Sequence, residues 1–258
     1  MQKGYNMYKE LDIDGKTIIV TGGAKGIGES CCRILAEKGA NVVLADIDYE
    51  NAKRVEQSIK DVGGSIFALK TDVTVEEDVK NMVKAAKEKF GKVDILINDA
   101  AIQKVTRYED ISLEEWKSVI DVNLNGGFLC SREVVKEFTN GGQILNIITV
   151  HSGLPRTNKY SYDASKAGME ILTKELAKNY ADKNITVNAI SFGAVSTPMN
   201  EDWLDDEVAV NNTLSKVPMN IIFKPEEIAR FIYEILNKFS LYTTGSVFTI
   251  DGGRSLVG

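Results

Sequence analysis

Tyr162 and Lys166 are the two side chains of this sequence best suited to proton transfer. They lie four residues apart in a segment whose pattern predicts a helix, so both side chains share one helix face, one turn apart. A tyrosine hydroxyl titrates at about 10 in water, and a nearby ammonium group favours its ionised form. Tyr162 is therefore a candidate general acid or base. Because this spacing is common by chance, the assignment needs support from other residues.

Three polar residues give that support from places where ligands collect. Thr149 ends a predicted strand thirteen residues before Tyr162, and Asn98 ends another predicted strand. Ligands of a doubly wound sheet bind at the carboxyl ends of its strands, where the Thr149 hydroxyl could bind a substrate oxygen. Asn123 lies in a long predicted helix just before Gly126. The structural alternatives are a strand-end turn for Asn98 and a helix kink satisfied by its own amide for Asn123.

A glycine-rich turn, TGGAKGIG at residues 21–28, follows the first predicted strand and opens a helix. Glycines let the backbone turn tightly and approach a pyrophosphate, which then binds the unpaired N–H groups of the helix N-terminus. The residues predicted to contact a dinucleotide here are Gly22, Lys25, Gly26, Ile27 and Gly28.

Asp46 bears on which dinucleotide is used. It ends the second predicted strand 18 residues after Gly28, close to the offset at which a carboxylate binds the adenosine ribose hydroxyls, and Ile47 beside it is assigned to the same site. A carboxylate repels a 2′-phosphate, which favours NAD over NADP. Lys25 argues the other way, because its ammonium could pair with that phosphate. We expect NAD, since a fixed carboxylate outweighs one flexible lysine.

The elements that position these residues are predicted by the sequence pattern. Short β-branched runs alternate with longer amphipathic segments, which is typical of βαβ units. Strands are predicted at residues 17–21, 41–45, 65–70, 93–98, 143–149, 185–191 and 246–250. Helices are predicted at residues 26–38, 49–62, 75–90, 113–138, 161–180 and 225–237. The predicted fold is α/β, a Rossmann-type doubly wound seven-stranded parallel sheet with helices on both faces.

Short connections and the lack of a Pro/Ser-rich linker predict a single domain at residues 15–258, after a flexible N-terminal extension at residues 1–14. The exception is the long segment at residues 192–224. Segments of this length in compact domains are often lids. The sequence is equally compatible with a substrate lid and with a pair of solvated surface helices.

The chain resembles the classical short-chain dehydrogenase/reductase family from about residue 15 to residue 253. The motifs that carry the resemblance are TGGAKGIG at residues 21–28, Asp72-Val73, Asn98-Asp99-Ala100-Ala101, Asn123, Tyr162-Asp163-Ala164-Ser165-Lys166 and Asp251-Gly252-Gly253. The resemblance implies that Tyr162 is the general acid/base and that Lys166 lowers its pKa and holds the nicotinamide ribose. It also implies that Thr149, in place of the usual serine, orients the substrate carbonyl, and that Asn123 anchors a proton-relay water.

The resemblance also implies cofactor contacts elsewhere in the chain. Asp72 and Val73 would contact the adenine. Residues 98–100, which include Asn98 and Ala100, would line the adenosine ribose. Val195 and Thr197 would hold the carboxamide. The helices containing Asn123 and Tyr162 usually build a tetramer in this family, so a homotetramer is expected.

Several positions depart from the family pattern or lie near the expected substrate. Asp99 and Ala101 replace the second asparagine and the glycine of the usual Asn-Asn-Ala-Gly. Phe192 stands where a proline normally precedes Gly193, and we expect it near the substrate, at a pocket rim that is more apolar than usual. His151 and Arg156, between Thr149 and Tyr162, could contact an oxygen-rich or anionic substrate, although we favour an exposed polar loop because a charge in a loop is normally just solvated.

The function expected from these residues is an NAD(H)-dependent oxidoreductase that interconverts a secondary alcohol and a ketone. One alternative is an NADPH-dependent reductase of oxoacyl thioesters on a carrier protein. Another is a catalytically idle dinucleotide-binding sensor, which the Asp99, Ala101 and Thr149 departures suggest. The presence of both Tyr162 and Lys166 at helical spacing argues against the idle sensor, because such a role would not need the pair.

Composition excludes other classes of function. The chain has 258 residues and a net charge of -6 without a block of Lys or Arg, so neither nucleic acid nor an anionic membrane is an expected partner. Three cysteines and one histidine lack the spacing of a disulfide framework or a metal site. No run approaches the roughly 20 apolar residues of a membrane span, so we expect a cytoplasmic enzyme.

Overall fold

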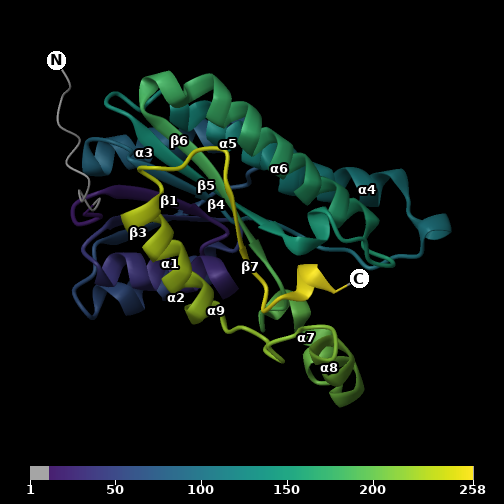
Figure 1. The fold of residues 1–258 in the computed structure, drawn as a ribbon. Helices are drawn as coiled ribbons and strands as arrows, with labels where there is room; N and C mark the ends of the chain where they lie inside the picture. Colours follow the sequence, from purple (N-terminus) through teal and green to yellow (C-terminus); the bar gives the residue numbers. More distant parts are fainter. Residues whose placement is uncertain (1–11, 258) are drawn as a thin grey trace.

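A seven-stranded parallel sheet forms the centre of the molecule in the computed structural model, which describes residues 12–257 (Figure 1). Its strand order is β3-β2-β1-β4-β5-β6-β7. The strands are β1 (Thr17–Thr21), β2 (Asn41–Asp46), β3 (Ile66–Lys70), β4 (Ile95–Asn98), β5 (Gly142–Thr149), β6 (Ile185–Phe192) and β7 (Val247–Ile250). The order reverses between β1 and β4, which is where a doubly wound sheet binds its ligands. The predicted fold class is confirmed, and the described residues form one domain.

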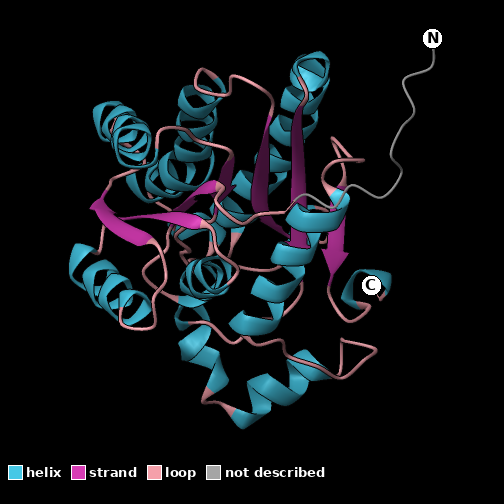
Figure 2. Ribbon diagram, turned by 90° about the vertical axis from the view of Figure 1, so that its left-hand side faces the viewer, coloured by secondary structure: helices cyan, strands magenta, loops and turns pink. Residues whose placement is uncertain are grey.

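Helices cover both faces of the sheet (Figures 1 and 2). One face packs against α1 (Gly26–Glu37), α2 (Tyr49–Lys60) and α9 (Pro225–Glu234). The other packs against α3 (Glu76–Phe90), α5 (Gly126–Val135) and α6 (Tyr160–Tyr180), with α4 (Leu113–Ile120) beside α6. Because each central strand is covered on both sides, its residues are apolar almost without alternation, and Ile18, Ile19 and Val20 are all fully buried.

Local sequence explains where the helices begin and end. The first turn of α3 carries Glu76 and Glu77 and its last turn Lys87, charges that complement the helix dipole. Gly91 closes α3 in the left-handed conformation. Pro225 opens α9 at a position that needs no backbone donor. None of the helices within residues 12–257 is long and apolar enough to cross a membrane.

The helix predicted at residues 113–138 is present, but its α-helical hydrogen bonding is interrupted and it ends earlier. It is divided into α4 and α5 by a π-helical turn at Asp121–Asn125, and it ends at Val135. The wide turn contains Asn123, whose side chain is bonded to neighbouring segments. The helix predicted at residues 225–237 likewise passes into a π-helical turn, at Ile235–Phe239.

The long segment after β6 contains two short helices, α7 (Glu201–Leu204) and α8 (Glu207–Leu214) (Figure 1). Asp206 caps α8 by accepting hydrogen bonds from the backbone N–H groups of Val208 and Ala209. The helix pair that we considered is therefore present. The predicted N-terminal extension lies almost entirely outside the described residues.

Candidate active site

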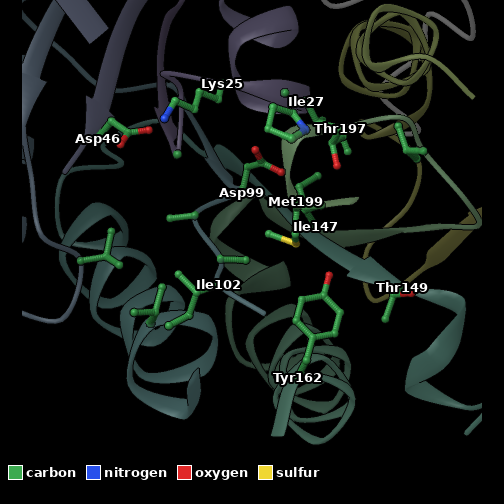
Figure 3. Close-up of a pocket in the computed structure, with 18 of the residues that line it drawn as sticks. Lys25, Ile27, Asp46, Asp99, Ile102, Ile147, Thr149, Tyr162, Thr197 and Met199 are labelled. Atoms are coloured by element: carbon green, nitrogen blue, oxygen red, sulfur yellow. The ribbon is translucent and has the colours of Figure 1, made fainter. Parts of the chain in front are cut away.

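A cavity of about 410 Å³ opens at the carboxyl ends of the strands, where the sheet order reverses between β1 and β4 (Figure 3). Its wall contains the glycine-rich turn, the ends of β2 and β5, and residues 197–200 before α7. The predicted residues that line it are Gly22, Lys25, Gly26, Ile27, Asp46, Ile47, Asp72, Val73, Ala100, Thr149, Tyr162, Lys166, Phe192, Val195 and Thr197. One cavity thus brings together most of the residues that the sequence marked for the cofactor and for the chemistry.

The glycine-rich turn approaches the chain after β4 too closely for side chains. Gly22 has a φ of +71°, and a Cβ there would lie 2.8 Å from the Ala100 backbone. A Cβ on Gly28 would lie 2.2 Å from the Gly22 carbonyl oxygen, so Gly28 serves the packing of the turn and does not line the cavity. Lys25, at the N-cap of α1, makes no side-chain cap. Lys25 therefore leaves the first N–H groups of α1 uncapped, whereas the Gly28 N–H is hydrogen-bonded to the Asp99 carboxyl group.

Asp46 and Lys25 lie at one end of the cavity (Figure 3). The Asp46 carboxylate accepts hydrogen bonds from the backbone N–H groups of Ala24, at 2.9 Å, and Asp48, at 2.8 Å, which fix its orientation. The Lys25 ammonium pairs with the Asp48 carboxylate at 2.8 Å, and this hydrogen bond raises the pKa of Lys25. The carboxylate is fixed, as expected, and the lysine already has an acidic partner.

The Tyr162 hydroxyl points into the cavity, with Thr149 beside it (Figure 3). Burial raises the pKa of Tyr162 to about 12, whereas the Arg156 charge lowers it. Lys166 donates to the Ile147 carbonyl oxygen at 2.7 Å, and burial lowers the pKa of Lys166 to about 8. Burial thus outweighs the neighbouring positive charge in setting the pKa of Tyr162, and the expected effect of Lys166 on this pKa stays a prediction.

Asn123 is buried beside the catalytic candidates but does not line the main cavity. Its Oδ1 accepts from the Ile102 N–H at 2.8 Å, and its Nδ2 donates to the Ser165 hydroxyl at 3.0 Å. The side chain therefore joins the π-helical turn to other segments, which is not the self-satisfied kink that we considered. A separate cavity of about 10 Å³ is bordered by Asn123 and Lys166. That volume is near the lower limit for one water molecule.

Asn98 corrects another expectation, because its side chain does not line the main cavity. The Nδ2 atom donates to the Ser131 hydroxyl at 3.0 Å and to the Asn146 Oδ1 at 2.8 Å. These bonds join β4 to α5 and to β5. Of the residues predicted at the adenosine ribose, Ala100 lines the cavity and the Asn98 side chain holds the fold.

His151 and Arg156 do not line the main cavity, and both residues are partly buried. The His151 Nδ1 lies 2.8 Å from the Leu154 carbonyl oxygen, and burial lowers the pKa of His151 to about 4. Arg156 forms an ion pair with Asp163, and its side chain is 25% exposed. The exposed polar loop that we favoured is therefore wrong for both residues, since both are partly buried and have partners.

Asp99 lies within residues 98–100, which were expected at the adenosine ribose, and it lines the cavity. Its carboxyl group lies near the centre of the cavity (Figure 3). Burial raises the pKa of Asp99 to about 7, opposed by the charge of Lys166 and by hydrogen bonding from the Gly28 backbone. The sequence marked this position twice, as part of residues 98–100 and as a departure from the family motif. Ile102 and Ile147 also line the cavity and carried no signal, whereas Met199 and Asn200 belong to the segment at residues 192–224 that was a candidate lid.

Comparison with characterised proteins identifies relatives that match along nearly the whole chain. Residues 22–255 match a family model described as enoyl-(acyl carrier protein) reductase. The chain is 38% identical over 249 residues to 3beta-hydroxysteroid dehydrogenase 1 of Eggerthella lenta, covering 95% of each protein. It is 36% identical over 255 residues to glucose 1-dehydrogenase 2 of Bacillus subtilis, covering 97% of this chain and 98% of the relative. It is 35% identical over 245 residues to the 3-oxoacyl-(acyl-carrier-protein) reductase FabG of Thermotoga maritima, covering 94% and 99%.

Solved structures share the fold. A short-chain type dehydrogenase/reductase from Mycobacterium marinum superimposes with a TM-score of 0.89 at 29% identity, covering 94% of this chain and 96% of the other. A 3-ketoacyl-(acyl-carrier-protein) reductase from Brucella melitensis, solved with NADH, gives a TM-score of 0.87 at 33% identity, covering 94% and 99%. With the cavity and its tyrosine–lysine pair, these matches show that the chain belongs to the classical short-chain dehydrogenase/reductase family, whose members are oxidoreductases that bind a nicotinamide dinucleotide.

Proposed function

We propose that this protein is an NAD(H)-dependent oxidoreductase that interconverts a secondary alcohol and a ketone. The observation that carries the proposal is the placement of Tyr162, Thr149 and Lys166 along one cavity whose other end holds Asp46. A dinucleotide can occupy both ends of this cavity at once. Its adenosine ribose would bind at the Asp46 end, and its reacting nicotinamide carbon would lie at the Tyr162 end.

The cavity fits that cofactor. Gly22 and Gly26 present backbone where a pyrophosphate needs close approach, and the start of α1 has no side-chain cap at Lys25. Asp46 has each oxygen held by one backbone N–H, which leaves a further lone pair on each for the ribose hydroxyls. When bound, the nicotinamide ring supplies the hydride acceptor for alcohol oxidation or the hydride donor for ketone reduction.

The protein's own side chains move the proton. In alcohol oxidation, the Tyr162 oxygen takes the hydroxyl proton, and in ketone reduction it returns that proton to the new alkoxide oxygen. The Thr149 hydroxyl donates a hydrogen bond to the same substrate oxygen. Lys166 places a positive charge beside the Tyr162 ring, and its ammonium is held there by a hydrogen bond to the Ile147 carbonyl oxygen.

Two features favour NAD over NADP. The fixed Asp46 carboxylate opposes a 2′-phosphate, and the Lys25 ammonium that would attract this phosphate is paired with Asp48. The runner-up is an NADPH-dependent oxoacyl-thioester reductase, which the 35% identity to the Thermotoga maritima protein favours.

The experiment that tests the function replaces Tyr162 by Phe and measures turnover on glucose, a 3β-hydroxysteroid and an acetoacetyl thioester with each dinucleotide. We expect wild type to turn over an alcohol or ketone with NAD(H), and Tyr162→Phe to lose at least about a hundredfold in kcat, as removal of a general acid/base does. NADH binding, followed by fluorescence, should remain within a few-fold. Unchanged turnover in the variant would contradict this mechanism, and activity confined to NADPH and the thioester would favour the runner-up.

A further inference from the structure

The Arg156 side chain lies against the ring of Tyr162 from outside the cavity. Its guanidinium carbon is 5.5 Å from the centroid of the Tyr162 ring. Two hydrogen bonds hold the guanidinium to Asp163, one from Nε to Oδ2 at 3.3 Å and one from Nη2 to Oδ1. Paired bonds of this kind fix the plane of an arginine as well as its distance. The Asp163 side chain is 13% exposed, so the ion pair is largely shielded from solvent.

Charged groups reach Tyr162 from several elements. Lys166, one turn further along α6, has its ammonium 5.7 Å from the ring centroid, and Asp163 lies on the same helix. Asp99 reaches the tyrosine from the end of β4 and Arg156 from the segment before α6, while His151 lies on the turn after β5. Burial lowers the pKa of His151 to about 4, so this histidine is neutral near pH 7.

The two cations near Tyr162 differ in how reliably they carry charge. The Lys166 ammonium is bound to the Ile147 carbonyl, and burial lowers the pKa of Lys166 to about 8, so part of its charge is lost at mildly alkaline pH. An arginine keeps its charge at every pH at which a protein is folded. Arg156 also lowers the pKa of Tyr162, whereas Asp99 and Asp163 raise it.

We propose that Arg156, oriented by Asp163, is a positioning residue that stabilises negative charge on the Tyr162 oxygen. Neither side chain lines the cavity, so the pair acts through Tyr162 and does not touch the substrate. Within the ion pair, the Arg156 cation favours ionisation of Tyr162 and the Asp163 carboxylate opposes it. This proposal rests on the proposed role of Tyr162 as the general acid/base.

The first test follows the ionisation of Tyr162 without turnover. It uses the ultraviolet absorbance of tyrosinate, taken for each variant as the difference from the same variant carrying Tyr162→Phe. Asp163→Asn leaves Arg156 unopposed, so Tyr162 should ionise at a pH about one unit lower than in wild type. In the double variant Arg156→Gln/Asp163→Asn, the pH at which Tyr162 ionises should no longer be lowered. Arg156→Gln alone should raise the pH at which Tyr162 ionises by about one unit.

The second test follows the same charge in catalysis. On the alcohol that wild type oxidises fastest with NAD, the acidic limb of the kcat/KM profile should move about one pH unit higher in Arg156→Gln and lower in Asp163→Asn. Arg156→Lys, which keeps the charge, should stay within a few tenths of a unit of wild type. Arg107→Gln is the control, because its exposed pair with Glu109 lies in a neighbouring loop, and we expect no shift.

A double variant that ionises at the same pH as Asp163→Asn overturns the proposal, because Arg156 would then contribute nothing to Tyr162. Shifts of the same sign in both single variants would also overturn it. If Tyr162→Phe leaves turnover intact, the proposed function fails, and the absorbance titration still decides the role of Arg156. If Arg156→Gln does not fold, Asp163→Asn and Arg156→Lys provide the comparison.

Discussion

Replacing Asp99 by Asn should make the stability of this protein less dependent on pH. Burial raises the pKa of Asp99 from 3.8 to about 7, so the folded protein retains a proton there that the unfolded chain releases. A carboxyl whose pKa is raised by folding contributes stability that is complete below its unfolded value and is lost as the pH rises through its folded value. The window for Asp99 therefore runs from pH 3.8 to about pH 7.

The magnitude follows from the difference between those two values. At about 1.4 kcal/mol per pKa unit, the whole effect has a ceiling of about 4 kcal/mol. About 3 kcal/mol of it should fall between about pH 5 and about pH 8, where the protein can be studied folded. The Asn side chain has the same shape and no titration, so Asp99→Asn should gain this amount over wild type across that range.

Urea unfolding at a series of pH values measures the effect as the difference in free energy of unfolding between variant and wild type. Asp110→Asn is the matched control, since Asp110 is an exposed carboxylate on the same connection after β4, and its difference from wild type should stay constant. If the curves of wild type and Asp99→Asn run parallel from about pH 5 to about pH 8, the assignment of a buried, protonated Asp99 is refuted.

Three further outcomes are expected. Asp46→Ala should shift the NADPH-to-NADH ratio of kcat/KM towards NADPH by about tenfold or more, about 1.4 kcal/mol, because it removes the carboxylate that opposes a 2′-phosphate; an unchanged ratio would contradict this role. Asn98→Ala should lower the free energy of unfolding by about 2 kcal/mol in urea titrations, because it leaves the buried Asn146 amide and a hydroxyl without their partner; a loss below about 0.5 kcal/mol would contradict it. Light scattering should give four times the chain mass, and Phe128→Glu, at an apolar side chain that is 43% exposed on α5, should lower it; a monomeric wild type would contradict the homotetramer.

The arrangement of the sheet could be predicted because the pattern that specifies it is local. Seven β-branched runs separated by amphipathic segments allow few alternatives to a parallel sheet, given that βαβ crossovers share one hand. The division of the helix at residues 113–138 could not be predicted in this way. Its amphipathic pattern continues across the π-helical turn, and the side-chain bonds of Asn123 at that turn go to residues distant in sequence.

The cofactor end of the cavity was also predictable, because glycines and a strand-end carboxylate act through backbone geometry that neighbouring residues determine. Gly22 and Asp46 line the cavity at the places that their spacing implied. The sequence also marked Tyr162 and Lys166, since a helix puts residues four apart on one face.

Only the tertiary structure decided which charges reach Tyr162 and how burial changes them. Lys166 is the neighbour that spacing suggests, yet its ammonium is bound to Ile147 in β5, and Arg156 approaches the ring from a separate segment. Asp99 likewise becomes a cavity carboxyl only because β4 ends beside the glycine-rich turn. Desolvation and Coulomb interactions depend on burial and on distances in space. The order of residues along the chain specifies neither of these quantities directly.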